Sequence, residues 1–170
     1  MRLHYLLLPL ALLVLSCNKT TEKTVKNSKE KTVKQDSTAY KVNEQYNDIV
    51  YQIEAFNLGM ERLNNPEIKE YLKDNLVNLK MLQKDYQLKA SDNGMKLQDL
   101  TEKHKKDLYK LSIADTKDFD NIFVLYYKEF LNGKIKALSG KTMTNEDFND
   151  LKNKYGNLLY DQKLYFDVIK

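Results

Sequence analysis

Between residues 39 and 63, apolar side chains recur at alternating intervals of four and three. The apolar positions are Val42, Tyr46, Ile49, Ile53, Phe56, Met60 and Leu63. Because this spacing follows the turn of a helix, it puts these residues on one face and predicts an amphipathic helix over 39–63. Asn65 then suits the capping position of a second helix, and Pro66 its first position, where a missing N–H costs nothing.

The same spacing continues beyond Pro66 and predicts a helix over 66–91, which the turn residues Asp92, Asn93 and Gly94 end. Its inward positions are Ile68, Leu72, Asn75, Leu79, Leu82 and Tyr86. We expect Leu79 to pack in the core. Asn75 is the one polar member, and we expect it at the rim of the core rather than in the role of a ligand.

A short helix is predicted over 101–111, and it contains His104. Lysines flank this histidine on both sides, so we expect its side chain to be exposed. Nucleophilic catalysis needs a base beside an activated hydroxyl or thiol. No glycine-flanked serine lies near His104 in the sequence, and the chain contains no phosphate-binding glycine loop. The sequence therefore indicates no catalytic motif.

Two further long helices are predicted, over 115–138 and over about 148–169. The first is rich in aromatic residues, and in the second the inward positions are Phe148, Leu151, Tyr155, Leu158, Gln162, Tyr165 and Ile169. A capping box is predicted over 144–147. Four long helices with short loops inside each pair predict an all-α four-helix bundle, made of two antiparallel hairpins plus the short extra helix.

The start of the chain has the form of a secretory signal, with one basic residue followed by an apolar run too short to span a bilayer. Val14-Leu15-Ser16-Cys17 resembles a bacterial lipobox. We therefore predict a signal peptide over 1–16, cleavage between Ser16 and Cys17, and acylation of Cys17. Asn18 follows, where an aspartate would favour the inner membrane, so we expect a periplasm-facing anchor in the outer membrane.

Residues 17–38 are predicted to form a flexible lysine-rich tether, and 39–170 the helical domain. After Cys17 the tether has six Lys, three acidic residues, no aromatic residue and a repeated EKTVK sequence, a composition too polar to form a packed core. The whole chain carries a formal net charge of +4, but without Arg2 and the tether it has 21 basic and 21 acidic residues. A neutral domain does not indicate a nucleic-acid partner.

The body resembles a ferritin-like helical-bundle family of bacterial secreted proteins, known as domain of unknown function four-one-four-two. The resemblance spans about 48–169. It rests on LGM at 58–60, NPEIKEYLKDNL at 65–76, LTEKHKKDLYKLS at 100–112 and DFDNIF at 118–123. It implies a ferritin-like bundle, and the family has no firmly assigned activity.

This chain departs from the family at three positions that carry histidine in many relatives. They align with Leu79, Leu131 and Lys163. Metal sites in such bundles need glutamates together with Glu-x-x-His pairs, and the body contains no such pair. Glu54 and Glu129 are the candidate carboxylates, although solvated helix faces explain them better. We therefore predict no metal and no other cofactor.

Together these features predict a non-enzymatic lipoprotein of the bacterial cell envelope. The lipid on Cys17 attaches it to the membrane, and the helical bundle is presented to an unidentified periplasmic or outer-membrane protein. One alternative is a ferritin-like metal, redox or stress protein with a degenerate site. Another is a carrier of a small apolar ligand, which a roomy cavity near Asn75, Gly59 and Gly133 would favour.

Overall fold

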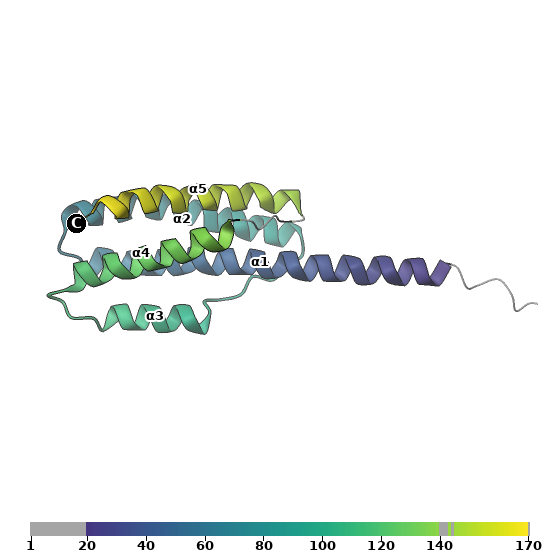
Figure 1. The fold of residues 1–170 in the computed structure, drawn as a ribbon, viewed down its shortest axis with the longest axis horizontal. Coiled ribbons are helices and arrows are strands. Elements are labelled where there is room, and N and C mark those ends of the chain that lie inside the picture. Colours follow the sequence, from purple (N-terminus) through teal and green to yellow (C-terminus); the bar gives the residue numbers. More distant parts are fainter. Residues whose placement is uncertain (1–19, 140–142, 144, 170) are drawn as a thin grey trace, which may run out of the picture. The chain divides into compact units, whose positions relative to one another are not determined.

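The computed structural model describes residues 20–139, 143 and 145–169. Over these residues the chain is all-helical and has no strand. The helices are α1 Thr20–Arg62, α2 Pro66–Asp92, α3 Glu102–Ser112, α4 Phe119–Leu138 and α5 Glu146–Val168 (Figure 1). The chain divides into two units, Met1–Gln35 and Asp36–Lys170, and the packing described below is that of the second.

Two helix starts differ from the sequence prediction. The backbone of α1 is helical from Thr20, inside the segment for which composition predicts a flexible tether. That segment contains no Gly or Pro to break a helix, and Lys and Glu are good helix formers. Helix α4 begins at Phe119 rather than at 115. Here Asp115 Oδ1 accepts a hydrogen bond from the Lys117 N–H, which favours a turn before the helix.

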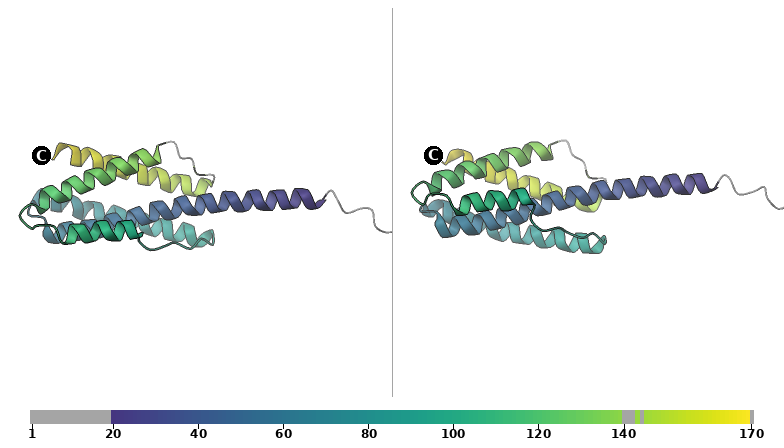
Figure 2. Two further views of the ribbon diagram at one scale, coloured as in Figure 1. Left: turned by 60° about the horizontal axis from the view of Figure 1, so that its bottom comes forward. Right: turned by 90° about the horizontal axis from the view of Figure 1, so that it is seen from below.

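The predicted apolar repeats form one hydrophobic core, contributed by α1, α2, α4 and α5. Leu79 is completely buried, as the repeat in α2 predicts. The largest fully buried side chains are Tyr86, Tyr155, Phe56, Phe119, Phe123, Phe148, Phe166, Ile49, Leu63, Leu72, Leu79 and Leu111. Helices α4 and α5 pack against each other, and α5 also packs against α2. The short α3 lies alongside α1 (Figures 1 and 2).

The turn between α1 and α2 follows the sequence prediction. The Asn65 side chain accepts hydrogen bonds from the N–H groups of Glu67 and Ile68 and so caps α2. Asp120 at the start of α4 accepts from the N–H groups of Asn64 and Asn65, at 2.8 and 2.9 Å. These bonds tie the turn to α4.

The structure explains why two positions carry glycine. Gly94, after α2, has φ +62°, a left-handed conformation that favours glycine. Gly59 lies where helices approach closely, because a Cβ there would stand 2.7 Å from Leu72 Cδ1 and 2.9 Å from Phe123 Cε2. The space between helices is therefore filled at Gly59, where an apolar carrier would need room.

Among the helices that the structure describes, none has the length and apolar character needed to cross a bilayer.

Candidate functional site

His104 is buried, and the prediction that it is exposed is wrong. Only 5% of the residue is accessible to solvent. Thr101 caps α3 by accepting a hydrogen bond from the His104 N–H at 3.2 Å, and this fixes where the helix starts. His104 and Leu111 are seven positions apart and are the buried residues of α3. The neighbouring lysines misled the prediction, because they occupy the other faces of the helix.

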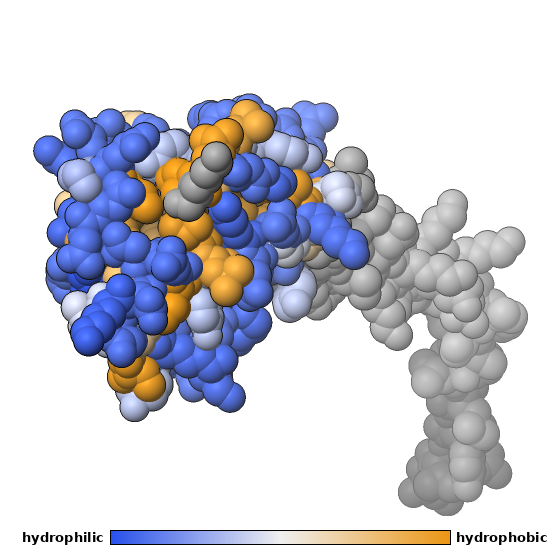
Figure 3. Space-filling model, turned by 60° about the vertical axis from the view of Figure 1, so that its left-hand side comes forward, coloured by the Kyte–Doolittle hydropathy of each residue, from blue (hydrophilic) through white to orange (hydrophobic). Residues whose placement is uncertain are grey.

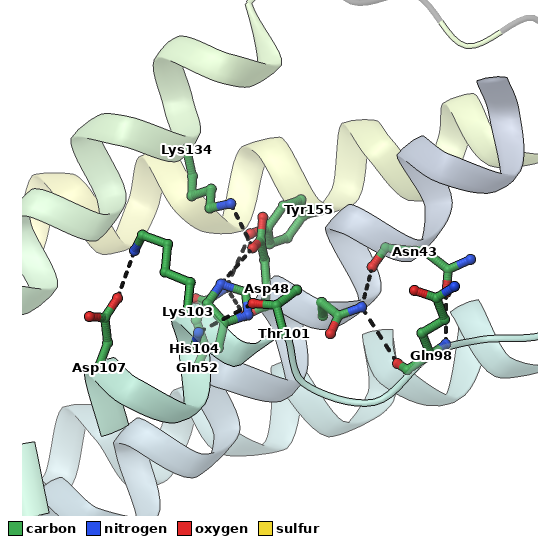
Figure 4. Close-up of polar contacts among 11 residues, drawn as sticks. Asn43, Asp48, Gln52, Gln98, Thr101, Lys103, His104, Asp107, Lys134 and Tyr155 are labelled. Carbon is green, nitrogen blue, oxygen red and sulfur yellow. Dashed lines mark hydrogen bonds and ion pairs between the residues drawn. The ribbon is translucent and has the colours of Figure 1, made fainter. Parts of the chain in front are cut away.

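His104 meets a buried carboxylate and an ammonium group from two other helices. His104 Nε2 lies 3.3 Å from Asp48 Oδ1, and Lys134 Nζ lies 2.7 Å from the same oxygen. Figure 4 shows the three side chains converging from α1, α3 and α4. Asp48 is 2% exposed, and the Lys134 ammonium, 2.7 Å away, is a positive charge that balances its carboxylate. The Tyr51 ring stacks on the imidazole with centroids 4.7 Å apart.

Polar contacts also hold both ends of the segment that contains α3. At its C-terminal end, the Arg62 guanidinium donates to the carbonyls of Leu111, Ser112 and Ala114, at 2.8, 2.6 and 2.6 Å. Before α3, Asn43 Oδ1 accepts from the Gln98 N–H at 2.7 Å. With the His104–Asp48 pair between them, these contacts dock α3 on α1.

A second polar group lies inside the core. Tyr127 Oη is 2.7 Å from Gln52 Oε1 and 3.0 Å from Gln162 Oε1, and Gln52 Nε2 is 3.4 Å from Tyr155 Oη. A phenol has one proton to donate. Turning the Gln162 amide over lets its Nε2, which otherwise has no partner in the described structure, donate to Tyr127. Desolvation by burial raises the pKa of Tyr127 and of Tyr155 well above the ordinary value.

Only some of these buried polar residues could be predicted from the sequence. Gln162 occupies a position of the predicted apolar repeat in α5, so its burial was indicated, and it is completely buried. Gln52 and Asp48 lie outside the predicted repeat of α1, and nothing in their sequence neighbourhood distinguishes them from surface residues. Asn75, which we expected at the rim, is buried with 9% of the residue exposed, and it donates to the Tyr71 carbonyl of its own helix at 3.0 Å.

The chemistry of the Asp48 site is that of a fixed ion network. His104 Nε2 faces Asp48 Oδ1 at 3.3 Å. In the described part of the chain, neither Asp48 Oδ1 nor His104 Nδ1 has a hydrogen-bond partner, and both atoms are buried. The cavity beside Asp48 and Lys134 has a volume of about 10 Å³, room for roughly one water molecule. The Lys134 ammonium already supplies the cation that the carboxylate needs.

The candidate metal carboxylates do not form a site. Glu54 and Glu129 are both exposed. Over the residues that the structure describes, no group of three or more His, Cys, Asp and Glu side chains could hold a metal ion. Of the positions that carry histidine in relatives, Leu79 and Leu131 are buried. Lys163 pairs with Asp167 at 2.5 Å on the surface of α5. Ser16 and Cys17 lie outside the described residues.

The surface carries exposed apolar side chains on α2 and α5. Val77 and Met81 on α2 are 59% and 56% exposed, and Tyr160 and Leu164 on α5 are 54% and 69% exposed. A groove of about 540 Å³ runs between the two helices. A different side of the domain, the end where α5 ends, also shows apolar side chains among hydrophilic ones (Figure 3). We call the outward surface of α2 and α5 the α2–α5 face.

The described structure thus defines an all-helical protein with a buried ion network and an apolar surface groove. Comparisons with models of protein families, with curated proteins and with solved structures find no match to this chain. The resemblance to the ferritin-like family remains a prediction from the sequence motifs.

Proposed function

We propose that this protein is a lipid-anchored protein of the bacterial cell envelope that acts by binding another protein. In this proposal, its helical domain is a four-helix bundle of the ferritin-like class, with α3 as the extra helix. The lipid on Cys17 attaches it to the outer membrane on the periplasmic side. The proposed contact surface is the α2–α5 face.

The observation that carries the binding role is the apolar groove between α2 and α5. Exposed apolar side chains scattered singly are ordinary on a soluble protein, but a contiguous apolar surface marks an interaction site. Here Met81, Leu82 and Leu158 form the apolar part of one groove of about 540 Å³, and its other lining residues are polar or charged: Asn78, Lys84, Asp85, Lys154, Asn157 and Asp161.

The anchor is supported by the sequence and has its own test. Replacing Cys17 by Ser removes the sulfur that would carry the lipid. We expect the wild-type chain to incorporate labelled palmitate in cells and to enter the detergent phase of a Triton X-114 partition. We expect C17S to do neither. A C17S chain that still partitions with detergent would refute the lipid anchor.

The binding surface is tested by a photoreactive benzophenone side chain placed at Met81 in the full chain. The matched control carries the same group at Lys106, which is exposed on α3. We expect a discrete crosslinked protein adduct in intact cells from position 81 and none from position 106. Equal patterns from the two positions would mean that the α2–α5 face has no special role.

A further inference from the structure

Two tyrosine rings lie face to face where α5 packs against α2. The rings of Tyr71 on α2 and Tyr165 on α5 are nearly parallel, with an interplanar angle of 6° and centroids 3.4 Å apart. Aromatic pairs ordinarily prefer offset or edge-to-face contacts with centroids about 4.5–7 Å apart, so this pair is unusually close. Among the ring contacts of the described residues, it is the one that joins two tyrosines.

Neighbouring groups hold the two rings in this arrangement. The Phe166 ring meets both of them edge-on, at interplanar angles of 87° to Tyr71 and 88° to Tyr165. Because Phe166 is completely buried, it supports the stack from the core. The Tyr165 hydroxyl donates to the Glu67 carbonyl at 3.3 Å, which ties the last turns of α5 to the start of α2. Groups on both helices therefore fix the stack.

The stacked pair is also within reach of solvent. Tyr71 and Tyr165 are both partly exposed, so each phenol can release its proton to water when it loses an electron. The buried Tyr127, by contrast, contacts the side-chain amides of Gln52 and Gln162, and an amide does not take up a proton at neutral pH. The pair thus combines a partner ring with an outlet for the protons.

We propose that Tyr71 and Tyr165 form an oxidative crosslinking site, at which a one-electron oxidant driven by hydrogen peroxide joins the two rings as dityrosine. Each phenol loses one electron and its O–H proton and becomes a phenoxyl radical. The radicals couple through their Cε carbons, the ring positions beside the hydroxyl group. The hydrogens on those carbons then move to the oxygens and restore both phenols. Hydrogen peroxide takes up the two electrons and two protons and becomes two molecules of water.

The stacked geometry places the reacting carbons close together. Parallel rings at this centroid distance have little sideways offset, so the nearest Cε carbons lie near van der Waals contact, about 3.5–4 Å apart. Holding two reacting groups in contact replaces an encounter of two molecules by a step within one. The new carbon–carbon bond would fasten α2 to α5, and its formation does not depend on the proposed binding function. Exposed tyrosines without a tyrosine partner in the described structure can couple only between molecules: Tyr40, Tyr109 and Tyr160.

The test treats the full chain with a haem peroxidase and hydrogen peroxide, and then measures dityrosine in the monomer by fluorescence and peptide mass spectrometry. We expect a crosslinked peptide pair that joins residues 71 and 165, lighter than the two separate peptides by two hydrogen atoms. Y71F and Y165F should each lose this crosslink, because each variant keeps its ring but lacks one phenol. The matched control Y160F, which removes an exposed phenol, should keep it.

Further controls exclude an inactive oxidant, misfolded variants and chance encounters. Dimerisation of N-acetyltyrosinamide in a parallel tube shows that the oxidant is active, and an unchanged far-ultraviolet circular dichroism spectrum shows that the variants are folded. Diluting the protein should leave the yield of the 71–165 crosslink per chain unchanged, because the step occurs within one molecule. Absence of this crosslink from the oxidised wild-type chain, or a monomer crosslink that Y71F and Y165F both retain, overturns the proposal.

Discussion

Removing the Asp48 carboxylate tests whether the buried ion network stabilises the domain. In D48A, His104 and Lys134 lose the oxygen that lies 3.3 and 2.7 Å from them. Breaking a buried ion pair by removing one partner costs about 3–5 kcal/mol when the other charge stays buried. The Lys134 side chain is 24% exposed, so it can turn toward water. We therefore expect a loss of about 2–3 kcal/mol in the free energy of unfolding.

The assay is urea unfolding followed by circular dichroism, with thermal melts beside it. For a domain of this size, 1 kcal/mol shifts the melting temperature by about 4 °C, so D48A should melt about 8–12 °C lower. The control is D150A, which removes an exposed carboxylate 3.1 Å from Lys154 Nζ. Exposed pairs contribute little, and we expect a change within about 0.5 kcal/mol.

Hydrogen exchange locates the effect of D48A. Because His104 is one of the two buried residues of α3, loss of its partner should loosen α3 before the rest of the domain. Amides of 102–112 should exchange much faster in D48A, while those of α5 change only with the global stability. The reasoning is refuted if D48A unfolds within 0.5 kcal/mol of the wild type or if α3 keeps its protection.

Three further predictions follow from the structure. G59A should destabilise the domain by about 1–3 kcal/mol, because the added Cβ would collide with side chains of neighbouring helices. G156A is the control: an added Cβ there has nothing within 4 Å, so it should stabilise the domain by up to about 1 kcal/mol. Urea unfolding measures both changes. Replacing the helix cap in N65A should cost about 1 kcal/mol in the same assay. Burial raises the pKa of Tyr127 and Tyr155, whereas a tyrosine in the unfolded chain ionises near pH 10. The free energy of unfolding should therefore fall as the pH rises above about 10. Absorbance at 295 nm should show these two phenols ionising only when the domain unfolds, and ionisation before unfolding would contradict their burial.

The features that the sequence predicted well are those set by neighbours along the chain. The four and three spacing depends only on the turn of a helix, and it located the buried face of α2 correctly, including Leu79. In the second half of α5 it was off by one position, because Leu159 and Phe166 are completely buried while the predicted Leu158 and Tyr165 are only partly buried. The cap at Asn65 follows from residues two and three positions away. The division into leader, tether and domain stays a prediction, because residues 1–19 lie outside the described structure.

The features that escaped prediction depend on contacts between distant residues. His104 is buried because α3 docks on α1, and its partner Asp48 is 56 positions earlier in the sequence. The local composition, with lysines on both sides, describes the exposed faces of α3 and says nothing of the docked one. The same holds for Arg62, whose guanidinium binds carbonyls about 50 positions later.

Apolar repeats alone leave the register of the helices undetermined, and the buried polar residues supply what is missing. If one helix slipped by a turn along its neighbours, leucines and phenylalanines would still meet other apolar side chains. The bonds that Tyr127 makes with Gln52 and Gln162 join α4 to α1 and α5 at single positions, and a slip would leave these buried groups without partners. An unpaired buried polar group costs about 1–3 kcal/mol, comparable to a sizeable part of a domain's total stability. We infer that the apolar spacing selects which faces are buried, and that these tyrosine and glutamine pairs select one alignment among those that the spacing permits.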